Sequence, residues 1–229
     1  MNLYLGFDPG GKTKKEFGWA VCEANEQILT VRHKGRVENI QQALNAVKEA
    51  LSKITNTEQN IIGAGIDAPL VWGEMGVRAA DQLIREEIHY WAKSPGGTTQ
   101  EINSLRGACL AQGILLARLL HKNYPGILIT ESHPKALLYL FRKISNNKKP
   151  KSALNRDEIP EKYVRCEEEI LDEHERDAIL GAFTAFARTE KLPGWGNILS
   201  LEEKSILVTP FDYQAEYWMP LQCFCQPIK

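Results

Sequence analysis

Alternation of apolar and polar residues near the amino terminus predicts three consecutive strands. The first covers 3–8 and stops at the turn residues Pro9-Gly10-Gly11. The second and third cover 17–23 and 28–37, and only the short polar segment 24–27 separates them. Short polar connections of this kind join antiparallel neighbours, so we expect the chain to open as an antiparallel meander.

The pattern then changes to a helical period. Apolar residues recur at helical spacing over about 38–54, with lysines and glutamates on the other side, which predicts an amphipathic helix. Segment 61–67 is almost uninterruptedly apolar, as expected of a strand that helices cover on both faces. Another such strand is expected at 127–131, and further helices are expected at 103–124 and about 167–189.

Three segments have a less regular pattern. Residues from 71 to about 102 are expected to form a helical or lid insert, and the tail at about 193–229 is expected to be an extension of strands and turns. Segment 142–151 holds five basic side chains and no acid, and its Ser, Asn and Pro content predicts a loop. We therefore expect one domain over 1–229, with these additions.

The simplest threading gives an α/β fold with a mixed sheet, three antiparallel strands followed by two parallel strands, and helices on both faces. Strands 3–8, 61–67 and 127–131 are expected to be parallel because helical crossovers connect them. Their carboxyl ends then share one edge, where open α/β sheets bind ligands. Asp8, Asp67 and Glu131 stand at those three ends.

Converging carboxylates point to a cation. Like charges at one edge cost free energy unless a cation or a shared proton compensates, and oxygen ligands are what Mg²⁺ and Mn²⁺ require. His174 and Asp177 fall inside the apolar stripe of the helix at 167–189. A buried histidine is most often a satisfied core residue, and Asp177 could instead pair with Arg176. The strand-end carboxylates favour a functional role for Asp177. Small residues beside it would let the helix approach the sheet closely: Ala178, Gly181 and Ala182.

Composition narrows the class of protein. The 229 residues carry 28 Lys+Arg and 29 Asp+Glu, a net charge of -1, so nucleic acid would have to meet a local patch. A hydrophobic content of 43% excludes a disordered chain. No apolar run approaches 18 residues, which excludes a membrane span. Without a recognisable signal peptide, we expect a cytoplasmic protein. Its five scattered cysteines indicate reduced thiols: Cys22, Cys109, Cys166, Cys223 and Cys225.

Two basic segments, 12–15 and 142–151, could follow a phosphate backbone, although charge runs in loops are usually solvated surface. Aromatic residues near the predicted insert could stack on bases, although core packing is their more common fate: Trp72, Tyr90 and Trp91.

Four segments of the chain resemble the successive motifs of a family catalogued as domain of unknown function 429, regarded as a predicted ribonuclease H-like nuclease. They are Gly6-Phe7-Asp8-Pro9-Gly10-Gly11, Gly65-Ile66-Asp67-Ala68-Pro69-Leu70, Glu131-Ser132-His133-Pro134 and His174-Glu175-Arg176-Asp177-Ala178. The resemblance spans 1 to about 188. Its Arg-x-x-Asp stretch is matched by Arg78, Asp81 and Arg85, whose spacing also suits an intrahelical salt-bridge ladder. The last segment is also similar to the closing motif of Holliday-junction resolvases of the same fold.

The resemblance implies a ribonuclease H-like fold and a divalent-metal-dependent nuclease, acting on DNA or RNA. Such a site would hold one or two Mg²⁺ or Mn²⁺ ions that activate water and stabilise the leaving oxygen of a phosphodiester. Asp8 would be the bridging ligand, and Asp67 and Asp177 would complete the metal set. Glu131 would be a ligand or an acceptor behind the ligands, and His174 a proton carrier or a partner of a ligand.

Two other functions fit parts of this pattern. Actin-like and sugar-kinase-like proteins share the sheet topology and a phosphate-binding Asp-x-Gly-Gly type turn, but they clasp nucleotide between two such domains, and 229 residues leave room for one. A catalytically inactive ribonuclease H-like scaffold that binds nucleic acid or protein is the other alternative. The intact carboxylates argue against it.

Overall fold

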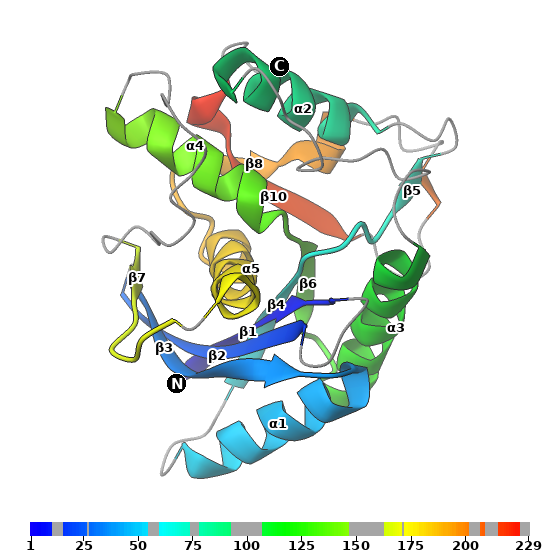
Figure 1. Ribbon diagram of the computed structural model, residues 1–229, viewed down its shortest axis with the longest axis vertical. Coiled ribbons are helices and arrows are strands. Elements are labelled where there is room, and N and C mark those ends of the chain that lie inside the picture. Colours follow the sequence, from blue (N-terminus) through cyan, green and yellow to red (C-terminus); the bar gives the residue numbers. More distant parts are fainter. Residues whose placement is uncertain are drawn as a thin grey trace.

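The computed structural model describes residues 1–10, 16–26, 28–54, 60–73, 78–92, 107–146, 163–170, 172–201, 207–208 and 215–224. It is a mixed α/β structure built on an eight-stranded sheet of order β7-β3-β2-β1-β4-β6-β10-β8 (Figure 1). The first three strands are β1 (Asn2–Asp8), β2 (Phe17–Asn25) and β3 (Ile28–Val37). They pair antiparallel in sequence order, as the alternation predicted.

Two parallel strands follow in the middle of the sheet. β4 (Asn60–Ile66) pairs parallel with β1, and β6 (Leu128–Glu131) pairs parallel with β4. In this register Ile66 lies between Phe7 and Glu131. The carboxyl ends of the three strands therefore share one edge, as predicted.

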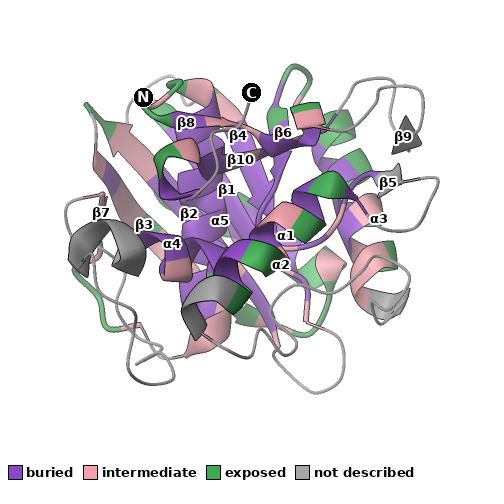
Figure 2. Cartoon of the chain, turned by 90° about the horizontal axis from the view of Figure 1, so that it is seen from above, coloured by how far each residue is buried: buried purple, intermediate pink, exposed green. Residues whose placement is uncertain are grey.

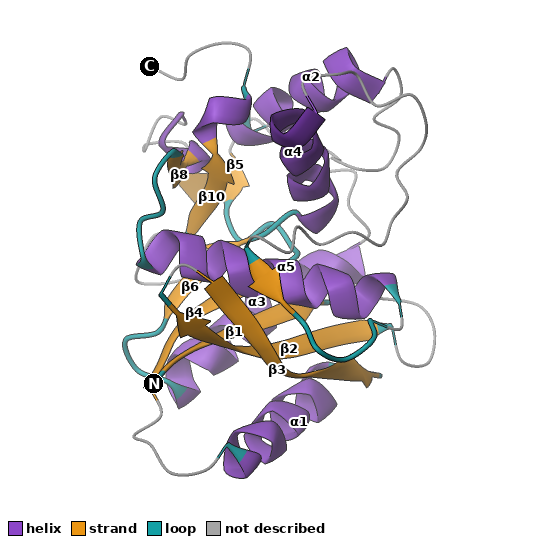
Figure 3. Cartoon of the chain, turned by 90° about the vertical axis from the view of Figure 1, so that its left-hand side faces the viewer, coloured by secondary structure: helices purple, strands orange, loops and turns teal. Residues whose placement is uncertain are grey.

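Five α-helices lie in the described part of the chain: α1 (Ile40–Lys53), α2 (Ala79–Ala92), α3 (Gly107–Asn123), α4 (Pro134–Asn146) and α5 (Glu173–Thr189). Asn39 caps α1 by accepting a hydrogen bond from the Gln42 N–H. Figures 1 and 3 show α1 and α5 on opposite faces of the sheet, with α4 and α2 stacked beyond α5. None of the described helices is long and apolar enough to cross a membrane.

Helix α5 lies directly on the sheet because glycines face it. A Cβ added to Gly6 would lie 1.6 Å from the carbonyl oxygen of Ala178, and one added to Gly65 would lie 1.9 Å from that of Gly181. The predicted close approach at the small residues of α5 is confirmed. Figure 2 shows α5 as the buried centre of the molecule. Such contact sets the position of α5 residues against the strand ends.

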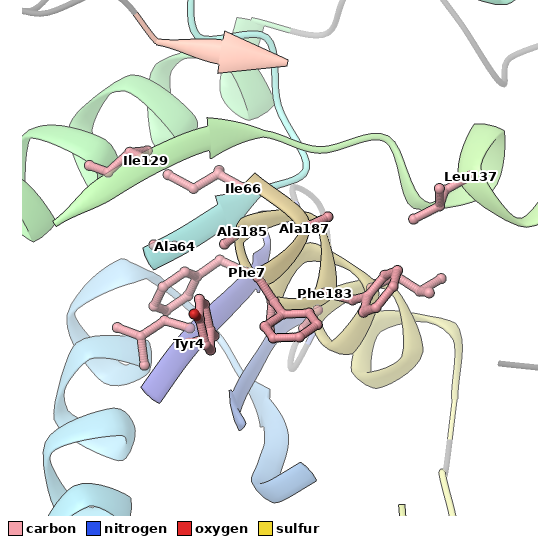
Figure 4. Close-up of a cluster of buried hydrophobic side chains, with 14 of the residues drawn as sticks. Tyr4, Phe7, Ala64, Ile66, Ile129, Leu137, Phe183, Ala185 and Ala187 are labelled. Atoms are coloured by element: carbon pink, nitrogen blue, oxygen red, sulfur yellow. The ribbon is translucent and has the colours of Figure 1, made fainter. Parts of the chain in front are cut away.

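Large side chains fill the space that the glycines leave. Tyr4 packs edge-on against Phe186 with ring centroids 5.3 Å apart, and Phe141 of α4 lies 5.9 Å from Phe183. Figure 4 draws Tyr4 of β1 and Phe183 of α5 within one cluster of buried hydrophobic side chains. The core continues on the other face of the sheet, where α1 buries Ala43, Leu44 and Val47.

Two predicted boundaries are wrong. The last helix begins at Glu173 rather than near 167, because Asp172 caps it by accepting from the N–H groups of His174 and Glu175. Before it, β7 (Val164–Arg165) pairs with β3. Residues 142–146 of the predicted loop are helical, because the buried apolar side of α4 continues to Phe141 and carries the helix onward to its end at Asn146. Residues 147–151 lie outside the described part.

The carboxyl-terminal extension widens the sheet beyond the five strands predicted. β10 (Glu216–Pro220) pairs parallel with β6, and β8 (Trp195–Asn197) pairs antiparallel with β10. Two short helical turns, η2 (Ile198–Leu201) and η4 (Leu221–Cys223), accompany these strands. β5 (Trp72–Gly73) and β9 (Leu207–Val208) form a separate pair.

Some sequence predictions fall outside the described residues. These are the basic segment 12–15, Cys225, residues 103–106 of the predicted third helix, and the side chains of Trp72, Tyr90 and Trp91. The cysteines that are described are free thiols: Cys22, Cys109, Cys166 and Cys223.

Candidate functional site

Two of the predicted carboxylates lie on adjacent chain segments at the sheet edge. Asp8 ends β1, and Asp67 follows β4 directly. The Asp67 N–H donates to the carbonyl oxygen of Phe7 at 2.9 Å, which continues the β1–β4 ladder to this edge. Backbone pairing therefore brings the two aspartates side by side.

His174 reaches Asp8 from the first turn of α5. Its Nδ1 lies 2.6 Å from Oδ2 of Asp8. The hydrogen bond to Asp8 raises the pKa of His174, although partial burial opposes the rise. Burial raises the pKa of Asp8, and the hydrogen bond to His174 opposes this only in part. The pair therefore tends to retain a proton.

Asp177 lies one turn further along α5 and is buried. The ion pair with Arg176, which the sequence left as an alternative, is present, with Nε at 2.9 Å and an Nη at 2.6 Å from Oδ1. Burial and the charge of Asp8 nevertheless raise the pKa of Asp177 to about 6. Arg176 therefore compensates only part of the cost of placing Asp177 there.

Asp67 is the least compensated member of the group. Burial, followed by the negative charges of Asp8 and Asp177, raises its pKa well above the ordinary value. Among the described residues, no ion pair or side-chain hydrogen bond is formed by its carboxylate. We call Asp8, Asp67 and Asp177 the carboxylate cluster. The charge of Asp8 raises the pKa of both other members, and the charge of Asp177 raises the pKa of Asp67.

Glu131 lies at the same edge, but its carboxylate is engaged elsewhere. Arg78 donates to Oε1 at 2.6 Å and to Oε2 at 2.8 Å, and the Leu70 N–H donates to Oε2 at 3.0 Å. Arg78 also forms the predicted i,i+3 salt bridge with Asp81 at 2.7 Å. Arg78 is fully buried, so its guanidinium does not reach the surface where a substrate phosphate would bind. Its pairing with Glu131 was not predicted.

Lys135 is a further residue of the site that the sequence did not single out. It lies in the first turn of α4, its side chain is 48% exposed, and its Nζ lies 3.6 Å from Oε2 of Glu173. Its positive charge lowers the pKa of each member of the carboxylate cluster. The available signal was its position directly after the Glu131-Ser132-His133-Pro134 segment at a helix start.

Helix α3 borders the site on another side. Gln112 donates to the carbonyl oxygen of Gly10 at 3.0 Å, and the Cys109 thiol lies 3.7 Å from the carbonyl oxygen of Asp67. Burial and the charge of Asp67 raise the pKa of Cys109 to about 12, so its thiol stays protonated and is a poor nucleophile. Among the described residues the hydroxyl of buried Tyr217 has no hydrogen-bond partner, and burial, followed by the charge of Glu131, raises its pKa.

The chemistry of the cluster suits a hard divalent cation better than a soft one, since its donors are carboxylate oxygens. Within the described residues, no three His, Cys, Asp or Glu side chains are already arranged as a metal-ligand group. Asp8 is turned to His174 and Asp177 to Arg176. A cation at the cluster would therefore compete with these two side chains for carboxylate oxygens.

We found no match to this chain among protein-family models, curated proteins or solved structures. Its function therefore has to be inferred from the site itself.

Proposed function

We propose that this chain is a divalent-metal-dependent nuclease that hydrolyses the phosphodiester bonds of nucleic acid. One observation carries the proposal: the carboxylate cluster gathers three acidic side chains at one sheet edge, and Asp67 forms no ion pair with a described residue, although the charge of Lys135 lowers its pKa in part. Buried like charges are costly unless a cation compensates them, and Mg²⁺ or Mn²⁺ bound by oxygen ligands would do so.

The strand order supports a ribonuclease H-like core. β3, β2 and β1 are antiparallel neighbours, β4 and β6 follow as parallel strands, and α5 covers the face next to the cluster. This is the arrangement that the resemblance to the domain of unknown function 429 family implies. In this interpretation β7, β10 and β8 are additions at the two edges.

The proposed metal set is Asp8, Asp67 and Asp177. A bound divalent ion would activate water and stabilise the charge that develops on the leaving oxygen. His174 is suited to hold or move a proton, because its ring bonds Asp8 and remains partly exposed. Lys135 stands at the rim of the cluster with a half-exposed side chain, which suits contact with a substrate phosphate.

Cleavage of a substrate panel tests this proposal. Single strands, duplexes, RNA–DNA hybrids and branched junctions should be cut with Mg²⁺ or Mn²⁺ and not in EDTA, and Asp8→Asn should abolish turnover. Glu49→Gln is the control, because it removes one negative charge from an exposed side chain of α1, away from the cluster.

Metal-independent cleavage, or full activity in Asp8→Asn, would overturn the mechanism. ATP consumption without nucleic-acid cleavage would favour the kinase-like alternative instead.

A further inference from the structure

Arg78 uses every N–H group of its guanidinium inside the protein. Its Nε and one Nη donate to the two oxygens of Asp81 at 2.8 and 2.7 Å. Both Nη atoms donate to Glu131, at 2.8 and 2.6 Å, and Nη1 also donates to the carbonyl oxygen of Val71 at 3.2 Å. Five donors thus meet five acceptors, which fixes the side chain in one geometry.

This network holds the segment that carries Asp67. Glu131 Oε2 accepts from the Leu70 N–H at 3.0 Å, and Arg78 donates to the Val71 carbonyl oxygen. The Arg78–Glu131 pair therefore holds the backbone of Leu70 and Val71 in place. At the other end of the segment, the Asp67 N–H is bonded to Phe7 at 2.9 Å. Between these anchors Pro69 has a fixed φ, so residues 67–70 have little freedom to move.

We propose that Arg78 and Glu131 are positioning residues that hold Asp67 in the carboxylate cluster, and that Glu131 is not a metal ligand. The inference rests on the proposed function. If Glu131 turned to a metal, Arg78 would keep a buried charge with two unmet donors, and breaking a buried ion pair in this way is strongly unfavourable. In this proposal the Arg-x-x-Asp stretch has a structural role: Asp81 orients Arg78, and Arg78 orients Glu131.

The chain offers a matched control. Arg188 is also a buried arginine, with Nε 3.0 Å from Oε2 of Glu216 and an Nη 2.7 Å from the carbonyl oxygen of Ile129. It lies eleven residues beyond Asp177 on the same helix, which is roughly 16 Å along the axis. Loss of these two hydrogen bonds should lower the stability of the protein without moving Asp67.

The test compares Arg78→Lys with Arg188→Lys in the full chain. Lysine keeps the positive charge but cannot reproduce the hydrogen bonds that the planar guanidinium donates to several acceptors at once. Both variants should melt below the wild type in EDTA. Only Arg78→Lys should weaken Mn²⁺ binding and lower kcat, each by about 10- to 100-fold, as is typical when a partner of a metal ligand is removed. Its KM for nucleic acid should stay near that of the wild type. Glu131→Gln should likewise weaken Mn²⁺ binding and lower kcat. This second variant replaces Arg78→Lys in the comparison if Arg78→Lys does not fold.

Wild-type Mn²⁺ affinity and kcat in Arg78→Lys or Glu131→Gln would overturn the inference, and so would equal losses in the Arg188→Lys control. These outcomes leave the proposed function intact if the wild type cleaves and Asp8→Asn does not. A wild type that neither binds Mn²⁺ nor cleaves would overturn both.

Discussion

Neutralising Asp177 should stabilise the metal-free protein. In Asp177→Asn the side chain keeps its shape and an oxygen for Arg176 but loses the charge that burial and Asp8 disfavour. An aspartate that served only as the structural partner of Arg176 would behave in the opposite way, because its removal would leave a buried cation unpaired. The sign of the stability change therefore separates the two roles of Asp177.

The raised pKa sets the magnitude. Folding lifts the pKa of Asp177 from 3.8 to about 6, and about two pH units at 1.4 kcal/mol each give ~3 kcal/mol. Because the folded state binds this proton more tightly than the unfolded state, the favourable contribution is complete below about pH 4 and is lost as pH rises through about 6. Asp177→Asn avoids that loss. At pH 7.5 we expect a Tm roughly 6–12 °C above the wild type, at 2–4 °C per kcal/mol for a chain of this size.

Thermal melts in EDTA between pH 4 and 8 provide the assay. Glu49→Gln is the control, because it removes one negative charge from an exposed side chain of α1. The advantage of Asp177→Asn should vanish near pH 4 and grow through pH 6. Mn²⁺ at a hundredfold excess over its dissociation constant should stabilise the wild type by roughly 2.7 kcal/mol and Asp177→Asn much less. A lower Tm for Asp177→Asn at pH 7.5, together with no response of the wild type to Mn²⁺, would refute the reasoning.

Two further predictions test the packing of α5 and the substrate side of the cluster. Gly6→Ala would place a methyl group 1.6 Å from the Ala178 carbonyl oxygen. Urea melts should therefore show a loss of at least about 3 kcal/mol in the free energy of unfolding. Gly126→Ala should cost only about 1 kcal/mol, because alanine would be strained at the positive φ of this residue but would meet no neighbouring atom. Equal losses in the two variants would contradict this packing. Lys135→Gln, in the Asp8→Asn background, should weaken nucleic-acid binding and reduce the slope of log affinity against log salt concentration by about one. Lys53→Gln on α1 should change neither the affinity nor the slope. An unaltered slope in Lys135→Gln would exclude a phosphate contact at Lys135.

The sequence predicted the middle of the sheet because its strands have clear apolar patterns and are bounded by clear signals. β1 alternates and stops at Pro9-Gly10, and β4 is a continuous apolar run. Once these strands were parallel, the positions of Asp8, Asp67 and Glu131 followed from the common direction of the strand ends. Periodicity and crossover rules are local or topological, so they need no knowledge of side-chain contacts.

The edges of the sheet were beyond such reasoning. β7 has only two residues, and β10 (Glu-Tyr-Trp-Met-Pro) lacks the continuous apolar run that identified β6. β10 also joins β6 from the far end of the chain. The start of α5 was misplaced for a related reason. Acidic residues before it resemble a first helical turn, and only the cap at Asp172 shows where the helix begins.

What the acidic residues do at the edge depended on tertiary structure. Sequence spacing alone placed Glu131 with the other carboxylates, and Arg78 with Asp81 three residues away. The fold instead joins Arg78 to Glu131 across 53 residues and leaves Asp67 without an ion pair in the described part of the chain. Which carboxylate is neutralised depends on distances of a few ångströms between separate elements, because a buried ion pair forms only where geometry satisfies both partners. The sequence by itself determined which residues reach the edge, and the packing of α4, α5 and the segment after β4 decided which of them remain free to bind a cation.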